Sequence, residues 1–321
     1  MNTRTTFRLT ILLAAAVLAV PGSYAKRRGG GGGDADEHRR KGVEFADAKQ
    51  FDKAIEEFSK EVEAAPDNPE AYRDRGTAYR AAGRAAVAAN DGATSATRFD
   101  SSNADFSKMI ELSPKSPTGY IERSETELAQ IQYDAAINDL NKALELKGDE
   151  GLIYKFRGFA YVGSRQWDKA VADFTTAIQK NPNDQQNYDQ RALAYRNLKN
   201  FPAAIQDYTA AIEKNPSYEP EYARRGLTYA MTEEYEKAIP DYQQALKLDP
   251  NDQVTQQNLT YAQSRLATKN APTPTPTPTP GAPLFTPVRI FIAVVILAVI
   301  AAIVRFFTRG KPEPTSTMRI R

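Results

Sequence analysis

Charged side chains that could act as acids, bases or ion-pair partners recur through the middle of the chain. The arginines are Arg75, Arg123, Arg157, Arg191 and Arg225, and the aspartates are Asp105, Asp139, Asp173, Asp207 and Asp241. A ladder of alternating charge could in principle supply acid–base catalysis. A feature that recurs in every segment is better explained by a role that every segment shares. We therefore interpret the ladder as structural ion pairing.

Composition restricts the other kinds of chemistry. The absence of cysteine excludes disulfides, thiolate zinc sites, iron–sulfur clusters and a cysteine nucleophile. The single histidine, His38, has no ligand partner at helical spacing, and we expect it to be exposed. Since no nucleophile, base and orienting group form a set, we expect a protein that is not an enzyme and that needs no cofactor or metal.

The overall charge of +2 hides two parts of opposite sign. Residues 35–268 contain 30 basic and 38 acidic residues, a net charge of −8, so the positive balance lies in the ends. Affinity for nucleic acid depends on lysine and arginine releasing the counterions of the phosphates. We therefore do not expect a nucleic-acid partner.

The N-terminal segment has the three parts of a secretory signal. Arg4 and Arg8 precede the apolar run 9–20, and Ser23 and Ala25 are the small residues before a cleavage site. We predict a signal peptide over residues 1–25. Residues 26–34, basic and then rich in glycine, are expected to be a flexible linker.

The C-terminal segment is expected to anchor the chain in a membrane. Residues 290–304 are fifteen apolar residues without interruption, and 288–307 are long enough to span a bilayer if Arg289 and Arg305 snorkel. The Thr-Pro repeats within residues 269–287 predict an extended spacer. The basic residues of the tail, 308–321, place the C-terminus in the cytoplasm and the acidic body outside it.

The body between these ends repeats with a period of 34 residues. Three markers recur at this interval: a tyrosine, an alanine four residues before an aromatic, and a closing proline. They are Tyr154, Tyr188 and Tyr222; Ala170, Ala204 and Ala238 with Phe174, Tyr208 and Tyr242; and Pro182, Pro216 and Pro250. A repeat of this length with small and aromatic residues at helical spacing predicts pairs of amphipathic helices that stack into a solenoid.

This pattern resembles the tetratricopeptide repeat. The resemblance covers nearly the whole body and implies an all-α, right-handed superhelical solenoid of about six helix-turn-helix units. The units are residues 35–68, 69–116, 117–150, 151–184, 185–218 and 219–252, followed by a capping helix at 253–268.

The second unit is fourteen residues longer than the others, and the surplus lies near residues 84–102. Ala96 and Phe99 stand at helical spacing ahead of Phe106, which favours a projecting helical hairpin around the turn at Asp91 and Gly92. A polar loop rich in alanine, serine and threonine fits the same residues. Both alternatives stay open on the sequence.

The resemblance also implies a concave groove lined by the first helix of each unit. The positions that line it are Arg39, Arg73, Arg80, Ile121, Leu128, Leu152, Phe159, Val162, Leu193, Arg196 and Leu227. A groove that is basic at one end and apolar in the middle suits a peptide or helix of a protein partner. The alternative is that some of these side chains pack between units.

The function expected from these features is a non-catalytic protein-binding scaffold of the cell envelope. The chain would be a single-pass membrane protein with a periplasmic or extracellular body, and the combination of signal, spacer and anchor favours a bacterial source. In a second hypothesis the C-terminal helix is a processing or sorting signal of a surface-displayed protein.

Overall fold

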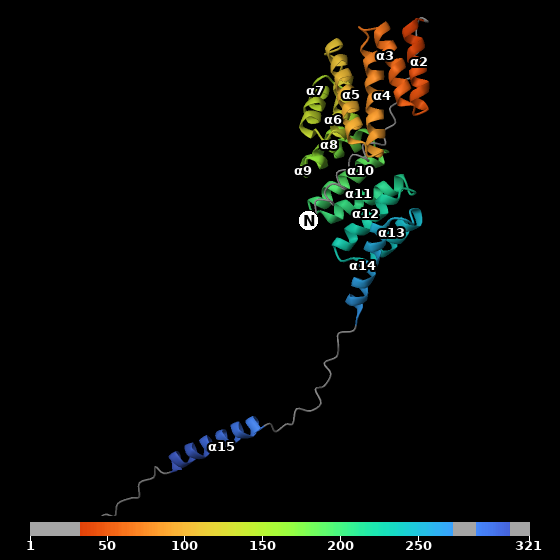
Figure 1. Ribbon diagram of the computed structural model, residues 1–321. Helices are drawn as coiled ribbons and strands as arrows, with labels where there is room; N and C mark the ends of the chain where they lie inside the picture. The colour runs from red at the N-terminus through yellow and green to blue at the C-terminus, as the bar shows by residue number, and fades with distance from the viewer. Residues whose placement is uncertain (1–32, 272–286, 309–321) are drawn as a thin grey trace, which may run out of the picture. The chain divides into compact units, whose positions relative to one another are not determined.

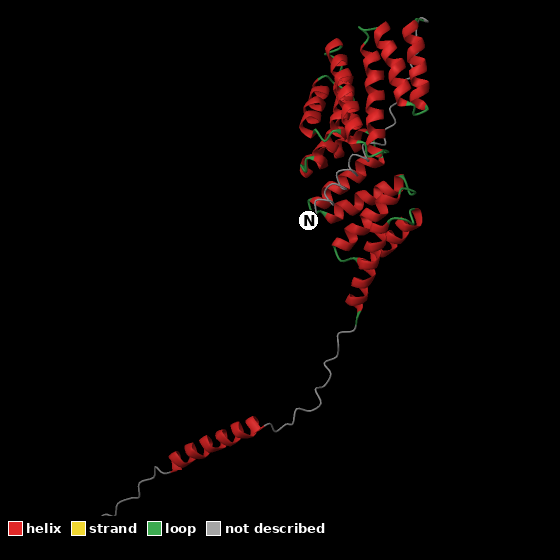
Figure 2. Cartoon of the chain, in the orientation of Figure 1, coloured by secondary structure: helices red, strands yellow, loops and turns green. Residues whose placement is uncertain are grey.

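The computed structural model describes residues 33–271 and 287–308, and in these ranges all regular structure is helical (Figures 1 and 2). The chain divides into two compact units, Met1–Leu266 and Ala267–Arg321. Apart from their edges, the predicted signal peptide, linker, spacer and basic tail lie outside the described residues.

Twelve helices of the compact unit Met1–Leu266 form six antiparallel pairs, in which consecutive helices pack on each other. The pairs, called here units 1 to 6, are α2 (Asp34–Asp47) with α3 (Phe51–Ala64), α4 (Pro69–Ala88) with α5 (Gly92–Leu112), α6 (Pro117–Ala129) with α7 (Tyr133–Glu145), α8 (Glu150–Gly163) with α9 (Trp167–Lys180), α10 (Gln185–Asn197) with α11 (Phe201–Lys214), and α12 (Glu219–Met231) with α13 (Tyr235–Leu248). The expectation of an all-helical solenoid is confirmed for the described residues.

The turn inside each pair has the same backbone form. One residue of each turn has a positive φ near 60°: Lys49, Asn90, Ile131, Arg165, Lys199 and Glu233. The amide of the residue that follows donates to the carbonyl five residues before it, as from Gln166 to Tyr161 at 2.8 Å. This Schellman-type closure satisfies the end of the first helix and turns the chain back on itself.

The cores of units 1, 2, 4 and 6 pair a glycine on the first helix with an aromatic ring on the second. Phe174 of α9 is fully buried, and a Cβ added at Gly158 of α8 would lie only 2.8 Å from its ring. Gly42 faces Phe58, Gly76 faces Phe106 and Gly226 faces Tyr242 in the same way. The small residue lets the two helices approach closely enough for the ring to fill the space between them.

The surplus residues of the second unit form the helical hairpin. Its helices α4 and α5 contain 20 and 21 residues, whereas the helices of the other units contain 13 or 14. Asp91 caps α5 by accepting a hydrogen bond from the amide of Thr94 at 3.0 Å. The loop alternative is therefore wrong.

A further helix, α14 (Gln253–Asn270), closes the C-terminal end of the array. Its residues Leu259 and Ala262 are buried in a cluster with Tyr235, Ala238 and Tyr242 of α13. Val254 and Tyr261 lie outside this cluster and are exposed beside polar residues, and the ring of Tyr261 meets that of Tyr235 edge to face at 6.3 Å. This one-sided packing is what a capping helix requires.

The second compact unit contains the helix α15 (Pro287–Thr308), over the segment predicted to span a membrane. In the parts of the chain that the structure describes, no helix meets the combined length and hydropathy needed to cross a membrane. The membrane span at residues 288–307 stays a prediction.

Candidate functional site

The arginine–aspartate ladder pairs the two helices of units 2 to 6. In every rung the guanidinium donates two hydrogen bonds to one carboxylate; from Arg157 to Asp173 they measure 2.7 and 2.9 Å. The other rungs are Arg75–Asp105, Arg123–Asp139, Arg191–Asp207 and Arg225–Asp241. The hydrogen bonds to Asp173 raise the pKa of Arg157. The structural interpretation of the ladder is confirmed, because each carboxylate is engaged on both oxygens.

The same arginines also join consecutive units. The Nη1 atom of Arg157 donates to Asn141 of the preceding unit at 2.7 Å, and that of Arg191 donates to Thr175 at 3.0 Å. Arg123 and Arg225 make the equivalent bonds to Ser107 and Thr209. Each of these four arginines therefore ties three helices together.

His38 differs from the expectation of an exposed side chain. It is half-buried, and its Nδ1 lies 2.8 Å from Oε2 of Glu57 on α3. This contact contributes to the packing of α2 against α3. Among the described residues, no group of three or more metal-ligating side chains comes together.

The first helices of neighbouring units contact one another, α2 with α4, α4 with α6, α6 with α8 and α8 with α10. We call the side of the array formed by these helices the inner surface. The eleven predicted groove residues lie on these helices and on α12, the first helix of unit 6, with very different exposure. Arg80, Leu128, Phe159 and Val162 are buried; Arg39, Arg73, Ile121, Leu193, Arg196 and Leu227 are half-buried; and Leu152 is 43% exposed.

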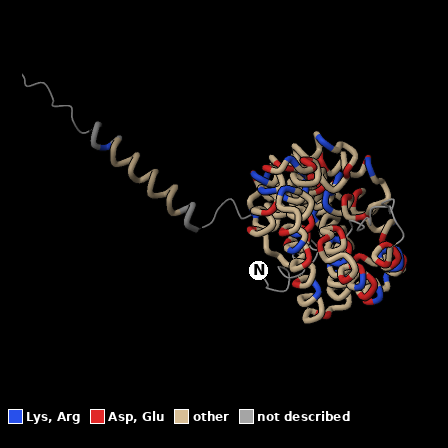
Figure 3. The backbone as a smooth tube through the Cα atoms, turned by 90° about the horizontal axis from the view of Figure 1, so that it is seen from above, with Lys and Arg blue, Asp and Glu red and all other residues tan. Residues whose placement is uncertain are grey.

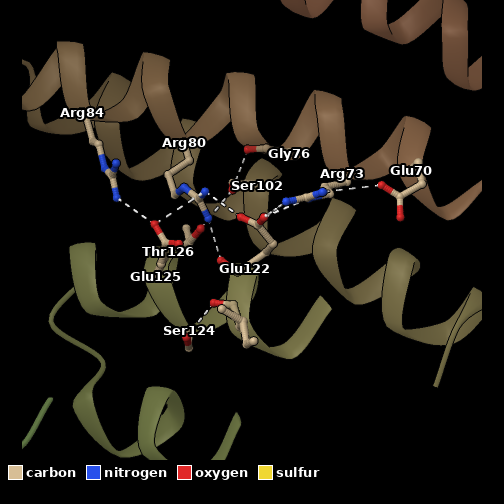
Figure 4. A network of polar contacts seen from close by, with 11 residues as sticks. Glu70, Arg73, Gly76, Arg80, Arg84, Ser102, Glu122, Ser124, Glu125 and Thr126 are labelled. Atoms are coloured by element: carbon tan, nitrogen blue, oxygen red, sulfur yellow. Dashed lines mark hydrogen bonds and ion pairs between the residues drawn. The ribbon is translucent and has the colours of Figure 1, made fainter. Parts of the chain in front are cut away.

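The arginines at the start of the inner surface are held by carboxylates of the next unit, as Figure 4 shows for Arg73 and Arg80. Arg39 donates to Asp74 at 2.7 Å, and Arg73 and Arg80 both donate to Glu122, at 2.9 and 2.7 Å. The expected basic end is therefore an internal ion-pair network. Charges of both signs are also interspersed over the whole array (Figure 3).

The network is buried enough to shift the pKa values of its members. Burial favours the neutral form of Glu122, but Arg80 and Arg73 outweigh it and hold its pKa below the usual value. Burial lowers the pKa of Arg84 to about 10, and this side chain lies 3.6 Å from Glu125. The bonds of Arg73 and Arg80 to Glu122 join α4 to α6, whereas Nε and Nη2 of Arg84 are buried without a hydrogen-bond partner in the described part of the chain.

The apolar residues predicted for the middle of the groove belong largely to the core. Leu128, Phe159 and Val162 lie in one cluster with Phe156 and Phe174, and the rings of Phe159 and Phe174 meet edge to face at 5.5 Å. Ile121 and Leu193 pack against the same cluster. For these five side chains, the alternative prediction of packing between units is therefore the correct one.

A pocket of about 140 Å³ lies farther along the inner surface, on units 4 to 6. We call it the α10–α12 pocket. Its lining is Phe159 of α8; Gln185, Gln186, Asp189 and Gln190 of α10; Asn215 and Tyr218 between α11 and α12; and Glu221 and Arg224 of α12. Three successive units thus contribute to one concave site, in which seven polar side chains accompany the rings of Phe159 and Tyr218.

The polar groups of the α10–α12 pocket are held in place by one another. Arg224 donates to Oδ1 of Asp189 at 2.5 Å, and Nε2 of Gln190 donates to Oδ2 at 2.9 Å. Nε2 of Gln185 donates to Oε1 of Glu221 at 2.6 Å. These bonds join α10 to α12 and fix the direction of each side chain.

Two buried oxygens of this pocket have no hydrogen-bond partner within the described residues. They are Oε1 of Gln190 and Oε2 of Glu221, on side chains that are 3% and 0% exposed. Burial, followed by the charge of Asp189, raises the pKa of Glu221 to about 8. A buried polar atom without a hydrogen-bond partner costs free energy.

Of the lining residues, sequence reasoning had selected only Phe159. The missed signal is a pair of opposite charges 35 residues apart on the first helices of neighbouring units, Asp189 with Arg224. Arg39 and Asp74 have the same separation and the same contact. This spacing identifies side chains that meet across the inner surface.

Fold and site together define a helical-repeat solenoid with a concave polar pocket. Family models described as tetratricopeptide repeat match residues 39–104, 157–219 and 220–252, about half of the chain. The chain belongs to the tetratricopeptide-repeat family.

Two solved structures with TM-scores above 0.5 share the fold. The Cut9–Hcn1 hetero-tetramer of the APC/C matches with a TM-score of 0.57 and 14% identity, over 79% of this chain and 46% of that one. PilF of Pseudomonas aeruginosa matches with a TM-score of 0.57 and 12% identity, over 72% and 97%. YrrB, described as a tetratricopeptide-repeat protein with an unusual peptide-binding site, matches with a TM-score of 0.48 and 20% identity, over 64% of this chain and 97% of that one. A search of curated proteins found no match.

Proposed function

We propose that the protein is a non-catalytic scaffold that binds an extended segment of a protein partner on its inner surface, at the α10–α12 pocket. Tetratricopeptide-repeat proteins mediate protein–protein interaction, which supports this class of function. The observation that carries the proposal is the pocket itself, to which three consecutive units contribute side chains. A site built across repeats suits a ligand that is extended along the array.

Tyr218 offers a direct test, because it lines the pocket and is 41% exposed. With the photo-crosslinking residue benzoyl-phenylalanine in its place, irradiation of intact cells is expected to join the protein to a segment of its partner, mapped by mass spectrometry. The matched control places the same residue at Tyr261, which is 55% exposed on α14 and is not part of the pocket lining. No adduct at position 218, or the same adducts at both positions, would contradict the proposal.

We also propose that the body acts outside the cytoplasm, anchored in the cell membrane by residues 288–307. The support is the uninterrupted apolar sequence 290–304 between Arg289 and Arg305, with a signal-like N-terminus and a basic C-terminal tail. The full chain is expected to resist alkaline carbonate extraction of membranes, and a variant that ends at Ala271 should be released. Release of the full-length chain would refute the anchor. A mature mass that lacks the final helix would favour the sorting-signal hypothesis instead.

A further inference from the structure

Beyond the presence of a binding site, the α10–α12 pocket has a chemistry that selects among partner side chains. We infer that it receives a lysine side chain of the bound segment, whose ammonium group donates to Oε1 of Gln190 and Oε2 of Glu221. This inference rests on the proposed function, since it concerns the partner bound at the same site.

The first argument is the kind of hydrogen-bonding group that the pocket leaves open. The orientation of Gln190 is settled because its Nε2 donates to Asp189, so the unpartnered atom must be the oxygen. In Glu221, Oε1 accepts from Gln185 and Oε2 is the atom without a partner in the described part of the chain. The carboxylate form of Glu221 and the amide of Gln190 therefore both call for a donor.

The second argument concerns which donor fits. An ammonium group has three N–H donors and no acceptor, so it can satisfy two oxygens without bringing another acceptor into the pocket. An asparagine or glutamine side chain would bring its own carbonyl oxygen. An apolar side chain would leave both oxygens buried and unpaired, which costs free energy.

The third argument is charge. Among the lining residues, the charges of Asp189 and Glu221 outnumber the one cation, Arg224, once the pH is above the pKa of Glu221, and Nη1 of Arg224 is already bonded to Asp189. A lysine restores the balance of the pocket. The ring of Tyr218, which is 41% exposed, provides the apolar surface that the methylene chain of a lysine covers.

The fourth argument links binding to protonation. Burial and Asp189 favour the neutral carboxyl of Glu221, Arg224 and the hydrogen bond from Gln185 oppose them, and the resulting pKa is about 8. Of the other groups near Asp189 and Arg224, Tyr208 is neutral below its pKa of about 12, and Arg196 is half-buried. A bound ammonium favours the carboxylate, so binding releases a proton and tightens as the pH rises through 8.

The test uses the full-length protein and blocked pentapeptides, Ala-Ala-Xaa-Ala-Ala, in which Xaa is lysine, arginine, glutamine or norleucine. Norleucine keeps the methylene chain of lysine without its charge. At about pH 9, below the usual pKa of lysine, the lysine peptide is expected to bind at least about tenfold more tightly than the norleucine peptide. At about pH 6 this preference should shrink, because Glu221 is then protonated.

The variant Glu221→Gln keeps an acceptor for Gln185 and removes the charge. It should remain folded, as thermal melting will show, and should lose the preference for lysine at about pH 9. Equal binding of the lysine and norleucine peptides, no detectable binding of the lysine peptide, or a preference that survives Glu221→Gln would overturn the inference. Tighter binding of the arginine or glutamine peptide would also overturn it.

The proposed function can survive that failure. If crosslinks form at position 218 while the lysine peptide has no advantage, the pocket is a binding site of different specificity. If crosslinks are absent as well, the proposed function itself fails.

Discussion

Replacing Phe174 with alanine is expected to lower the free energy of unfolding by about 3–5 kcal/mol. The ring is fully buried, lies against Gly158 and meets Phe159 edge to face. Its removal leaves a cavity between α8 and α9 that the close-packed helices cannot fill, because Gly158 has no side chain to move into it. Urea denaturation followed by circular dichroism measures the effect.

The control for this change is Tyr261→Ala, which removes an aromatic ring that is 55% exposed. It should cost about 1 kcal/mol, well below the loss for Phe174→Ala, since more than half of the side chain stays in water and its ring keeps only an edge-to-face contact with Tyr235. Similar losses for the two variants would show that the packing of small residues against rings does not stabilise the repeats.

The sequence was sufficient to predict this packing, because it depends on contacts inside one unit. The period of 34 residues places Gly158 and Phe174 sixteen residues apart on two paired helices, and Gly226 and Tyr242 have the same separation. The contacts in the structure follow this spacing. Local periodicity determines which face of each helix is buried, so the fold class could be derived.

The hairpin of the second unit could have been recognised by extending the same rule. Gly76 packs against Phe106, and seven residues farther out on both helices Gly83 packs against Phe99. Two helical turns on each side thus repeat the contact of a small residue with a ring. A polar loop has no reason to keep this pairing, whereas two lengthened helices need it.

The binding site was harder to predict because it depends on contacts between units. A first-helix position can face the partner or the next unit, and the family pattern does not distinguish these cases. Phe159 is 2% exposed because α9 packs against it, and Arg73 is held by Glu122 of the following unit. The pocket residues Asp189 and Glu221 are acidic, so a groove expected to be basic at one end and apolar in the middle did not include them.

The ladder should give the second large effect. Asp173→Ala leaves the half-buried Arg157 without the carboxylate that engages two of its nitrogens, and should lower the free energy of unfolding by about 3 kcal/mol. The matched control is Glu145→Ala, which breaks an exposed pair with Lys142 and should cost less than about 0.5 kcal/mol. Equal losses would mean that the ladder contributes no more than surface charges do.

A double variant separates the strength of the pair from the cost of an unpaired charge. Arg157→Met with Asp173→Leu removes both charges and fills the space with apolar atoms, so it should be more stable than Asp173→Ala alone. It also removes the bond from Arg157 to Asn141 of the preceding unit. If that bond couples the units, the double variant should unfold less cooperatively than the wild type, with a smaller dependence on urea. An unchanged urea dependence would mean that the ladder holds each helix pair together but does not couple the units.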